Sequence, residues 1–406
     1  MAATRTPQRP SAAQRRILAP LALAQFICSF AGSDMNVMIN DISEDLDTTV
    51  QGVQIAITIF LLVMAALMIP GGELTDRYGR KRCLRVGLVV YGIGALMSAA
   101  APGLGVLILG NSILEGVGTA LLIPPVYILT TLIFTNLTSR ARAFGVIMAL
   151  GGIGAAAGPL IGGLITSWLS WRAAFVFQAL VIVVIIVLSR NLADPLPPDP
   201  TRPFDTTGAV LSAVGLVLVV MGILAADDNV WLMIGLLAAG ALVLLWFYLS
   251  IRAKERAGKE PLPSTALFRN RTSNLGLVTQ NVQWLLLMGS SFTIATYLQV
   301  VRGYDAIQTG VIFTAATVGL LASSLAAERL AKRRPQRTLI MTGFVVTVAG
   351  IVVLTLGSSL GTAVAGTILV AGLTSGAYAA ALITLAVIGL VGLAAAVLLP
   401  AKPPPA

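Results

Sequence analysis

The stretch TTGAVLSAVGLVLVVMGILA (Thr206–Ala225) carries no charged residue and decides the fold class. A helix rises about 1.5 Å per residue, so this stretch covers the roughly 30 Å hydrocarbon core of a bilayer. Similar windows recur along the 406 residues, of which 57% are hydrophobic and only 11% charged. A soluble domain carries about a quarter charged residues and could not bury this much apolar surface. Because the windows are unbroken rather than alternating, the sequence predicts an all-α membrane protein and not a barrel.

Eleven such windows precede a final apolar stretch. They run approximately over Ile17–Asn40, Gln51–Pro70, Leu84–Ala101, Val106–Leu129, Phe144–Leu169, Ala173–Leu188, Thr206–Ala225, Trp231–Ile251, Asn274–Val301, Ala306–Ala327 and Thr338–Leu356. The last stretch, Leu360–Pro400, has no charge and is too long for one straight span. One span plus a re-entrant piece gives twelve spans in all, and a turn near Gly372–Gly376 gives thirteen.

The basic residues orient these spans. With the N-terminus in the cytoplasm, Arg172 and Arg302 alone fall outside, and Lys402 depends on the fold of the last stretch. The net charge of +10 therefore reflects membrane topology rather than a nucleic-acid partner. Arg15 and Arg16 precede a full-length span, so no cleavable signal peptide is expected. We expect a monomeric, multi-pass protein of the plasma membrane with a cytoplasmic N-terminus.

The windows and linkers divide the chain into five segments. They are an N-terminal six-helix bundle (1–190), a Pro-rich cytoplasmic linker (191–205), two inserted helices (206–251), a basic cytoplasmic loop (252–273) and a C-terminal bundle (274–406). Transporter halves commonly repeat one another, so the last bundle is expected to be incomplete.

After the second window the sequence reads GELTDRYGRKR (Gly72–Arg82), in which an acid stands between two glycines and is followed by a basic run. The glycines permit a tight loop, and the acid can pair with basic side chains or with a helix N-terminus. An ordinary positive-inside loop explains the basic residues but not the acid and the glycines. The segment resembles the cytoplasmic motif of the major facilitator superfamily. That resemblance implies a gate built from Gly72, Asp76, Arg77, Gly79, Arg80 and Lys81.

The fifth window contains GAAAGPLIGG (Gly154–Gly163). Gly154, Gly158 and Gly162 share one helix face, on which a neighbouring backbone can approach closely, and Pro159 permits a bend. A generic small-residue packing face has the same spacing. The whole string, with Gly163, resembles the motif of the antiporter branches of the superfamily, which implies export.

Other segments resemble the fourteen-helix drug:proton antiporter branch, which inserts two helices between its halves. They include DTTG (205–208), PL (261–262), LF (267–268) and YLQV (297–300). The resemblance covers about residues 17 to 373 and implies two helical bundles rocking about a central cavity, with two extra central helices. Two positions depart from the family pattern. Ser112 and Glu115 stand where an arginine and a glutamine are usual, and Asp34 lies one turn beyond Ala31, where an aspartate is usual.

Glu115 and Asp34 are the carboxylates well inside expected spans. An unpaired charge in hydrocarbon costs at least ~2.5–3.5 kcal/mol, so such acids face a cavity, form a pair or hold a proton. The chain has no histidine, which leaves proton transfer within the membrane to carboxylates. We predict that Glu115, near mid-span, is the principal proton-coupling residue. Asp34 is the second candidate; it is expected nearer the outer water, where a helix-packing hydrogen bond explains it equally well.

The substrate path is expected to include polar and aromatic residues, although such residues also hold membrane helices together. The candidates are Asn36, Gln280, Asn281, Gln283, Trp284, Tyr297 and Gln299. The expected function is export of a hydrophobic or amphipathic small molecule, driven by a proton gradient and needing no cofactor. The expected partners are thus that substrate, protons and the lipid bilayer. No loop shows a metal-ligand cluster, nucleophile motif or phosphate loop, so neither a metal nor catalytic residues are expected. An importer and a transport-incompetent or regulatory relative remain open alternatives.

Overall fold

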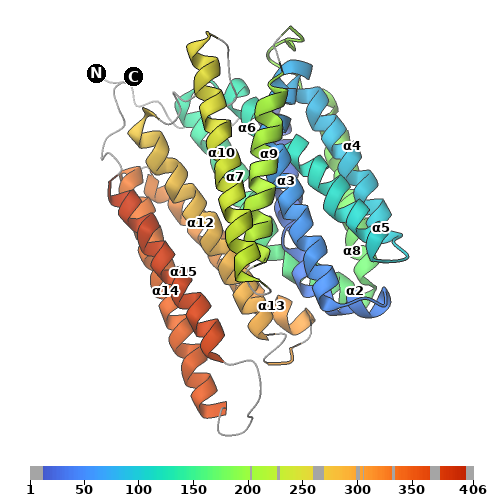
Figure 1. Cartoon of the computed structure of the whole chain (residues 1–406), viewed down its shortest axis with the longest axis vertical. Helices are drawn as coiled ribbons and strands as arrows, with labels where there is room; N and C mark the ends of the chain where they lie inside the picture. Colours follow the sequence, from blue (N-terminus) through green and yellow to red (C-terminus); the bar gives the residue numbers. More distant parts are fainter. Residues whose placement is uncertain are drawn as a thin grey trace. The chain divides into compact units, whose positions relative to one another are not determined.

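The computed structural model describes residues 12–201, 204–225, 229–258, 269–298, 302–304, 306–331, 334–365 and 375–398, and these residues form helices and no strand (Figure 1). Contacts divide the chain into two units, Met1–Ser264 and Thr265–Ala406. Seven of the described helices are long and apolar enough to cross a membrane, and an eighth is added if the two arms of one bent helix form one span. The predicted all-α membrane fold is confirmed.

The first unit opens with a broken span. Helix α1 (Ala12–Ala31) gives way to a 3-10 turn, η1 (Asp34–Val37), and then to a short helix, α2 (Ile39–Asp45). The expected single window Ile17–Asn40 is therefore not one straight helix. The remaining elements are α3 (Val50–Tyr78), α4 (Arg80–Ala99), α5 (Leu104–Leu107), the π-helical turn η2 (Ile108–Glu115), α6 (Gly116–Ile133), α7 (Leu137–Trp168), α8 (Trp171–Leu188) and η3 (Ser189–Asn191).

Helix α7 is the bent one. Its arms, residues 142–155 and 157–168, meet at 42°. Pro159 lies just beyond the bend, and a proline has no amide hydrogen to bond the carbonyl four residues earlier. The proline of the glycine-rich motif thus accounts for the change of direction.

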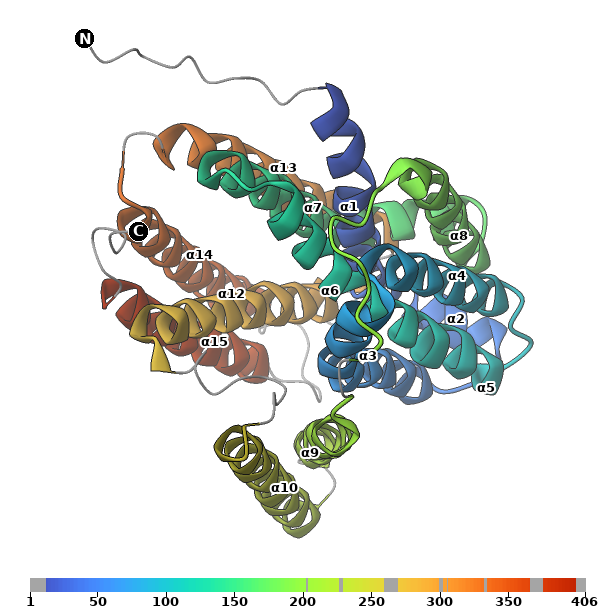
Figure 2. The same cartoon turned by 90° about the horizontal axis from the view of Figure 1, so that it is seen from above.

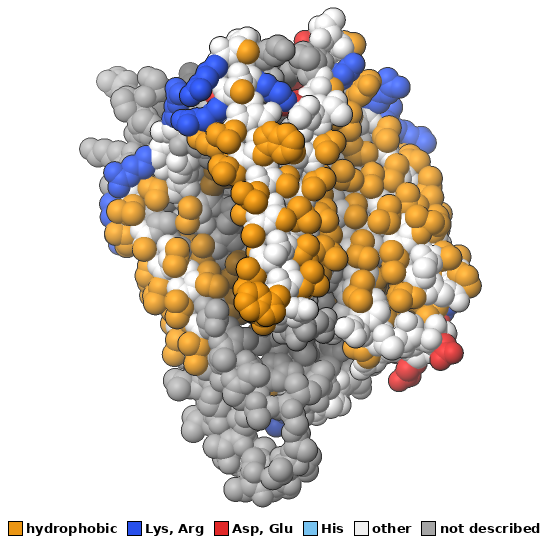
Figure 3. Space-filling view, in the orientation of Figure 1, with side chains coloured by type: hydrophobic (Ala, Val, Ile, Leu, Met, Phe, Trp, Pro, Cys, Tyr) orange, Lys and Arg blue, Asp and Glu red, His pale blue; other side chains and the backbone are white. Residues whose placement is uncertain are grey.

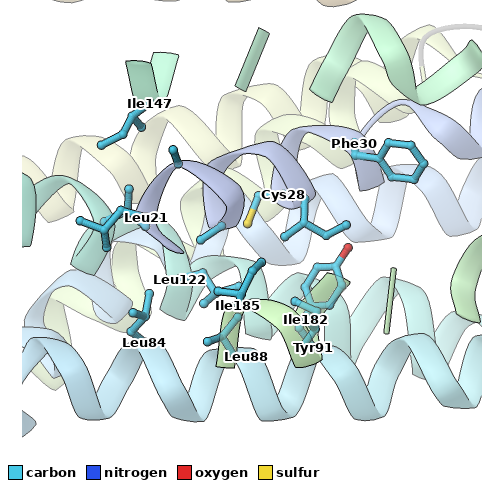
Figure 4. Close-up of a cluster of buried hydrophobic side chains, with 14 of the residues drawn as sticks. Leu21, Cys28, Phe30, Leu84, Leu88, Tyr91, Leu122, Ile147, Ile182 and Ile185 are labelled. Carbon is cyan, nitrogen blue, oxygen red and sulfur yellow. The ribbon is translucent and has the colours of Figure 1, made fainter. Parts of the chain in front are cut away.

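The core of the first unit joins α1, α4, α6, α7 and α8. Helix α1 packs against α7 and α8, and α4 packs against α6 and α8, as Figure 2 shows from above. Figure 4 shows the centre of this core, with Leu21, Cys28, Phe30, Leu84, Leu88, Tyr91, Leu122, Ile147, Ile182 and Ile185. Between membrane helices the stabilisation comes from close van der Waals packing, because lipid tails are as apolar as leucine. Gly87 and Gly118 permit such packing of α4 on α6: a Cβ at Gly87 would lie 3.0 Å from the Gly118 carbonyl oxygen.

Two further helices complete the first unit. Helices α9 (Thr206–Leu224) and α10 (Val230–Arg256) pack against each other, and α9 also packs against α3. Only 6% of the apolar window of α10 is buried, so most of that helix is open to lipid. Figure 3 shows hydrophobic side chains along α9 and α10, with Lys and Arg gathered toward one end.

The second unit contains α12 (Arg271–Thr296), α13 (Ala306–Ala331), α14 (Gln336–Ala365) and α15 (Ser375–Val397). Helix α15 packs against α14 and α12 around a core that includes Val282, Leu286, Phe344, Ile351 and Leu385. Helix α14 continues beyond its expected end at Leu356. The final apolar stretch then holds one described helix, as in the twelve-span alternative. The turn expected near Gly372–Gly376 lies partly outside the described residues.

Candidate functional site

Glu115 ends the π-helical turn η2 and is fully buried. Asn111 Nδ2 donates to its Oε2 at 3.3 Å, and Ser98 Oγ lies 3.5 Å from its Oε1. Ser112, which stands where the family has an arginine, donates to the carbonyl of Ala56 on α3 at 2.7 Å instead. The described partners of Glu115 are therefore neutral. A carboxyl without a cationic partner in such a site favours holding a proton.

Asp34 is also fully buried, near the end of the span Arg16–Val37, and its expected position nearer the outer water than Glu115 stays a prediction. The α-helix of the first span ends before this residue, and the 3-10 turn that follows packs against α7 and receives a hydrogen bond from Gln178 on α8. Oδ1 of Asp34 accepts from the backbone amide of Met35 at 2.8 Å, and Oδ2 accepts from Gln178 Nε2 at 2.9 Å. The 3-10 break thus draws the carboxyl into the bundle.

Tyr91 and Gln178 extend the hydrogen bonding of Asp34. The hydroxyl of Tyr91, on α4, donates to Oε1 of Gln178, on α8, whose amide nitrogen donates to Asp34. Asp34, Gln178 and Tyr91 are all fully buried. In Figure 4 the hydroxyl oxygen of Tyr91 points away from its own helix, toward the side where Phe30 lies. Asp34, Gln178 and Tyr91 therefore form one buried hydrogen-bonded chain, while Glu115 has Asn111 and Ser98 as its partners.

The predicted gate motif is helical rather than a loop. Helix α3 runs to Tyr78 and α4 starts at Arg80, so only Gly79 interrupts the helices, with φ +95°. Gly72 lies inside α3, where a Cβ would make only an ordinary contact of 3.9 Å with Pro124 on α6. Within the motif, Arg80 pairs with Asp76, four residues earlier, at 2.7 Å. Of the two glycines, Gly79 therefore serves the sharp change of direction between α3 and α4.

The linker after α8 is attached to this motif at two places. Oδ2 of Asp194 accepts from the backbone amides of Arg80 at 2.6 Å and Lys81 at 3.3 Å. Further along, Oε1 of Glu73 accepts from the backbone amide of Asp205 at 2.6 Å. Asp205 also caps α9 by accepting from Gly208 and pairs with Lys254 on α10. The motif is thus held by the chain that leads to the inserted helices.

An ionic contact holds the opposite end of the first unit. Arg172, at the start of α8, pairs with Asp45 and donates to the Ala101 carbonyl at 2.9 Å, and Trp171 Nε1 donates to Asp45 at 3.1 Å. The hydrogen bond from Arg172 lowers the pKa of the Asp45 carboxyl. Partial burial raises the pKa of the neighbouring Asp41.

The glycine row of α7 lies against the broken first span. A Cβ at Gly154 would lie 2.3 Å from the Phe26 carbonyl oxygen, and one at Gly158 would lie 2.1 Å from Ser33 Oγ. A Cβ at Gly162 would lie 3.1 Å from the Cβ of Asp34. Pro159 and Gly163 are buried beside this row. The row therefore sets the approach of α7 to the turn that carries Asp34.

The expected substrate-path residues fall in both units. Asn36 is half-buried in η1 and donates to the Ser33 carbonyl at 3.2 Å. On α12, Asn281 and Gln283 are exposed, while Gln280 and Trp284 are half-buried. Tyr297 follows α12 and is half-buried, and Gln299 lies outside the described residues. Asn281 donates to the Leu277 carbonyl of its own helix at 2.8 Å, so this side chain satisfies itself locally.

Sequence reasoning missed Gln178 and Tyr91. Gln178 is the one polar side chain in the apolar window Ala173–Leu188, and a lone polar residue in a membrane helix normally finds a partner on another helix. The sequence therefore could have indicated that Gln178 bonds another helix. It could not identify the partner, because that depends on how α4, α8 and η1 meet.

Comparison with known proteins gives the family. The family model described as Major Facilitator Superfamily matches residues 21–250. Puromycin resistance protein pur8 of Streptomyces alboniger is 32% identical over 336 residues, which cover 82% of this chain and 66% of pur8. Multidrug efflux pump LfrA of Mycolicibacterium smegmatis is 29% identical over 355 residues, covering 87% of this chain and 69% of LfrA. The chain thus spans about two thirds of the length of these relatives.

A solved structure gives the same fold. A peptide transporter POT in complex with sulfate superposes with a TM-score of 0.60 and 20% identity, over 96% of this chain and 82% of the transporter. The family match is consistent with the motif at the junction of α3 and α4 and with the glycine row of α7. The chain belongs to the major facilitator superfamily.

Proposed function

We propose that this chain exports a hydrophobic or amphipathic small molecule across the plasma membrane in exchange for protons. The observation that carries the proposal is the full burial of Asp34 and Glu115 inside the first unit, each with a neutral side chain as hydrogen-bond donor, Gln178 for Asp34 and Asn111 for Glu115. Two carboxyls without a described cationic partner can bind and release protons, whereas a permanently paired acid cannot. The gradient would supply the driving force, and no cofactor is needed.

The substrate class comes from the relatives. Pur8 is named for resistance to puromycin, and LfrA is named as a multidrug efflux pump. The glycine row on α7 supports export, because its string resembles the antiporter motif and it packs directly on the turn that holds Asp34. We place the N-terminus in the cytoplasm, since the Arg- and Lys-rich ends of α3 and α4 then face the cytoplasm, and we propose that one chain works as a monomer.

Everted membrane vesicles test this proposal. The chain is expressed in a host lacking its own efflux pumps. A pH gradient is then imposed on the everted vesicles, with the vesicle interior more acidic than the medium. Accumulation of ethidium and of radiolabelled puromycin is then measured. We expect uptake into everted vesicles that collapses when a protonophore is added, and no such uptake in vesicles without the protein.

The other outcomes identify the alternatives. Uptake only into right-side-out vesicles would indicate an importer. Correctly inserted protein that moves no compound of a broad panel in either direction would indicate a transport-incompetent or regulatory relative. Uptake that ignores the protonophore would remove the proton from the proposal.

A further inference from the structure

We propose that the basic ends of α4 and α8 form a binding site for an anionic phospholipid. The site contains Lys81 and Arg85 of α4 and Arg190, which follows α8 in η3. Its ligand is a lipid whose headgroup carries a net negative charge and whose acyl chains lie on the apolar face of the same two helices. The binding of lipid is separate from the proposed export function and can be tested on a protein that transports nothing.

Two cationic side chains converge on one atom of this site. Lys81 Nζ donates to the Arg190 carbonyl oxygen at 3.2 Å, and Arg85 Nη2 lies 3.5 Å from the same oxygen. The two residues are four apart on α4, a spacing at which like charges repel each other. The exposed side chain of Arg190 adds a third cation at the residue that supplies the oxygen. Three positive charges are thus gathered where α4 meets the end of α8.

These charges are not neutralised within the part of the chain that the structure describes. No described carboxylate forms an ion pair with any of the three cations. Asp194 lies near Lys81, but its Oδ2 accepts from the backbone amides of Arg80 and Lys81. The Arg190 carbonyl uses one donor of the ammonium and one of the guanidinium, and the others have no described acceptor. Unused donors on cations are what phosphate oxygens bind.

Capping of α8 is the simpler explanation for part of this geometry. A helix leaves its last carbonyls without intrahelical partners, and lysine or arginine can bind them. One cation would serve that purpose at Arg190, whereas two are present. A cap also stabilises the protein equally well in every lipid. The two explanations therefore differ in a quantity that can be measured.

Toward the middle of the membrane, α4 and α8 present apolar side chains to the bilayer. The two helices pack side by side (Figure 2). Each carries a row of apolar side chains on the same face as its arginine, between 49% and 56% exposed: Val89 and Ile93 on α4, Val183 and Val187 on α8. A lipid phosphate at the cations therefore has an apolar surface for its acyl chains directly beside it. A small soluble anion would contact only the charged part of this surface, so the arrangement favours a phospholipid.

The membrane supplies a ligand of this kind on the proposed side. With the N-terminus in the cytoplasm, as proposed above, the start of α4 faces the cytoplasmic leaflet, which contains anionic lipids. Lysine and arginine near such a surface are attracted to it over a distance that salt shortens. Selectivity for a negative headgroup and sensitivity to salt are thus the properties expected of the site.

Lipid binding to the purified full chain tests the inference, measured by native mass spectrometry and by thermal unfolding in detergent. Dioleoyl phosphatidylglycerol is compared with dioleoyl phosphatidylcholine, which has the same acyl chains and no net charge. We expect phosphatidylglycerol to bind more tightly and to raise the melting temperature more. Arg85→Gln should lower its affinity about fivefold, and Arg85→Gln combined with Arg190→Gln about thirtyfold. Affinity for phosphatidylcholine should not change in either variant. Lys81 is kept, because it also belongs to the gate motif.

Two other arginines serve as matched controls. Arg82→Gln removes the same charge from the same helix, and the structure describes no hydrogen bond from this exposed side chain to Arg190. Arg140→Gln removes an arginine that also donates to a backbone carbonyl, that of Phe134, at 2.9 Å. Each should lower the affinity for phosphatidylglycerol less than Arg85→Gln does. If the double variant does not fold, Arg85→Gln alone decides the result.

Four results would overturn the inference. The first is equal affinity of the wild type for the two lipids. The second is an equal loss from Arg82→Gln and Arg85→Gln, because membrane topology needs only the total of basic residues on one side. The third is a melting temperature that Arg85→Gln lowers by the same amount with and without phosphatidylglycerol, as a helix cap would require. The fourth is displacement of the lipid by millimolar inorganic phosphate, which would indicate a site for small anions.

Selective binding of phosphatidylglycerol that Arg85→Gln weakens would support the inference, even in a protein that moves no substrate. That result would leave lipid binding established and the export function rejected. Conversely, proton-driven export by a chain that binds both lipids equally would reject the lipid site alone.

Discussion

The carboxylate of Asp194 accepts a hydrogen bond of 2.6 Å from the backbone amide of Arg80, which lies 114 residues earlier in the chain. Arg80 is the first residue of α4, so Asp194 satisfies one of the amides that a helix start leaves without an intrahelical partner. Its negative charge also lies at the positive end of the helix dipole. The linker therefore caps the helix that carries the basic part of the gate motif.

Replacing this cap should weaken the first unit. We expect Asp194→Ala to lower the free energy of unfolding by about 1 kcal/mol, as loss of an N-terminal cap does. Thermal unfolding of the detergent-solubilised protein measures the effect. Asp199→Ala is the control, since Asp199 lies in the same linker and accepts from Thr201. Equal melting temperatures for wild type and Asp194→Ala would contradict the capping role.

Asp76→Asn should impair transport while preserving expression. The substitution keeps the shape of the side chain and removes the charge that pairs with Arg80 at 2.7 Å. A partly exposed pair of this kind stabilises by about 1 kcal/mol or less, so folding should survive. Dye transport in vesicles measures the effect. The Asp76→Glu variant, which keeps the negative charge, should retain part of the transport activity. A variant that transports as well as the wild type would leave the motif with a topological role alone.

Gly158→Leu should disturb folding or the transport cycle. A Cβ here would lie 2.1 Å from Ser33 Oγ and 3.1 Å from the Phe30 carbonyl oxygen, and overpacking of this kind costs about 1–3 kcal/mol. Gly145→Leu, on the same helix, is the matched control because a Cβ there meets nothing within 4 Å. Expression level, melting temperature and dye transport are compared. The prediction is wrong if the two variants behave alike.

Glu115→Gln should abolish transport driven by a proton gradient while leaving substrate exchange largely intact. Glutamine keeps the shape and can still meet Asn111 and Ser98, but it cannot titrate. The measurement compares gradient-driven uptake with counterflow of labelled substrate at equal pH on both sides. Retained gradient-driven uptake would move the coupling role to Asp34, and Asp34→Asn is then the variant to assay.

The Arg172–Asp45 contact should stabilise the protein only above strongly acidic pH. The hydrogen bond from Arg172 lowers the pKa of Asp45 in the folded state, so unfolding takes up a proton as the pH falls. The contribution is complete above the unfolded value of about 4 and is lost as the pH drops through the lowered folded value. Melting temperatures of wild type and Asp45→Asn should therefore differ near pH 6 and converge once the pH falls below the lowered pKa of Asp45. Asp47→Asn controls for a neighbouring change of charge, and a difference independent of pH would argue against an ionic role.

The spans were predictable because their signal is local. The apolar windows are mostly helical where the structure describes them, and the glycine spacing on α7 placed three residues on one face without knowledge of the partner. The gate segment was misjudged as a loop, since the positive-inside rule gives the side of the membrane and not the backbone conformation. Helix α3 continues through Glu73 and Asp76, and only Gly79 leaves helical geometry.

The composition of the site was only half predictable. Charge in an apolar window singled out Asp34 and Glu115, because such residues are costly and rare. The partners of Asp34 depend on contacts between η1, α4 and α8, which lie far apart in sequence. The end of the first α-helix had a local signal in Gly32, Ser33 and Asp34, but the burial of Asp34 had none.

The linker attachments have a consequence for sequence drift in this lineage. Asp194 and Glu73 bind main-chain hydrogens at positions 80, 81 and 205, rather than the side chains there. Every amino acid except proline supplies such a hydrogen. A change of side chain at 80 or 81 would therefore not by itself release the linker. Attachment of the linker is thus independent of the pair that the Arg80 side chain forms with Asp76.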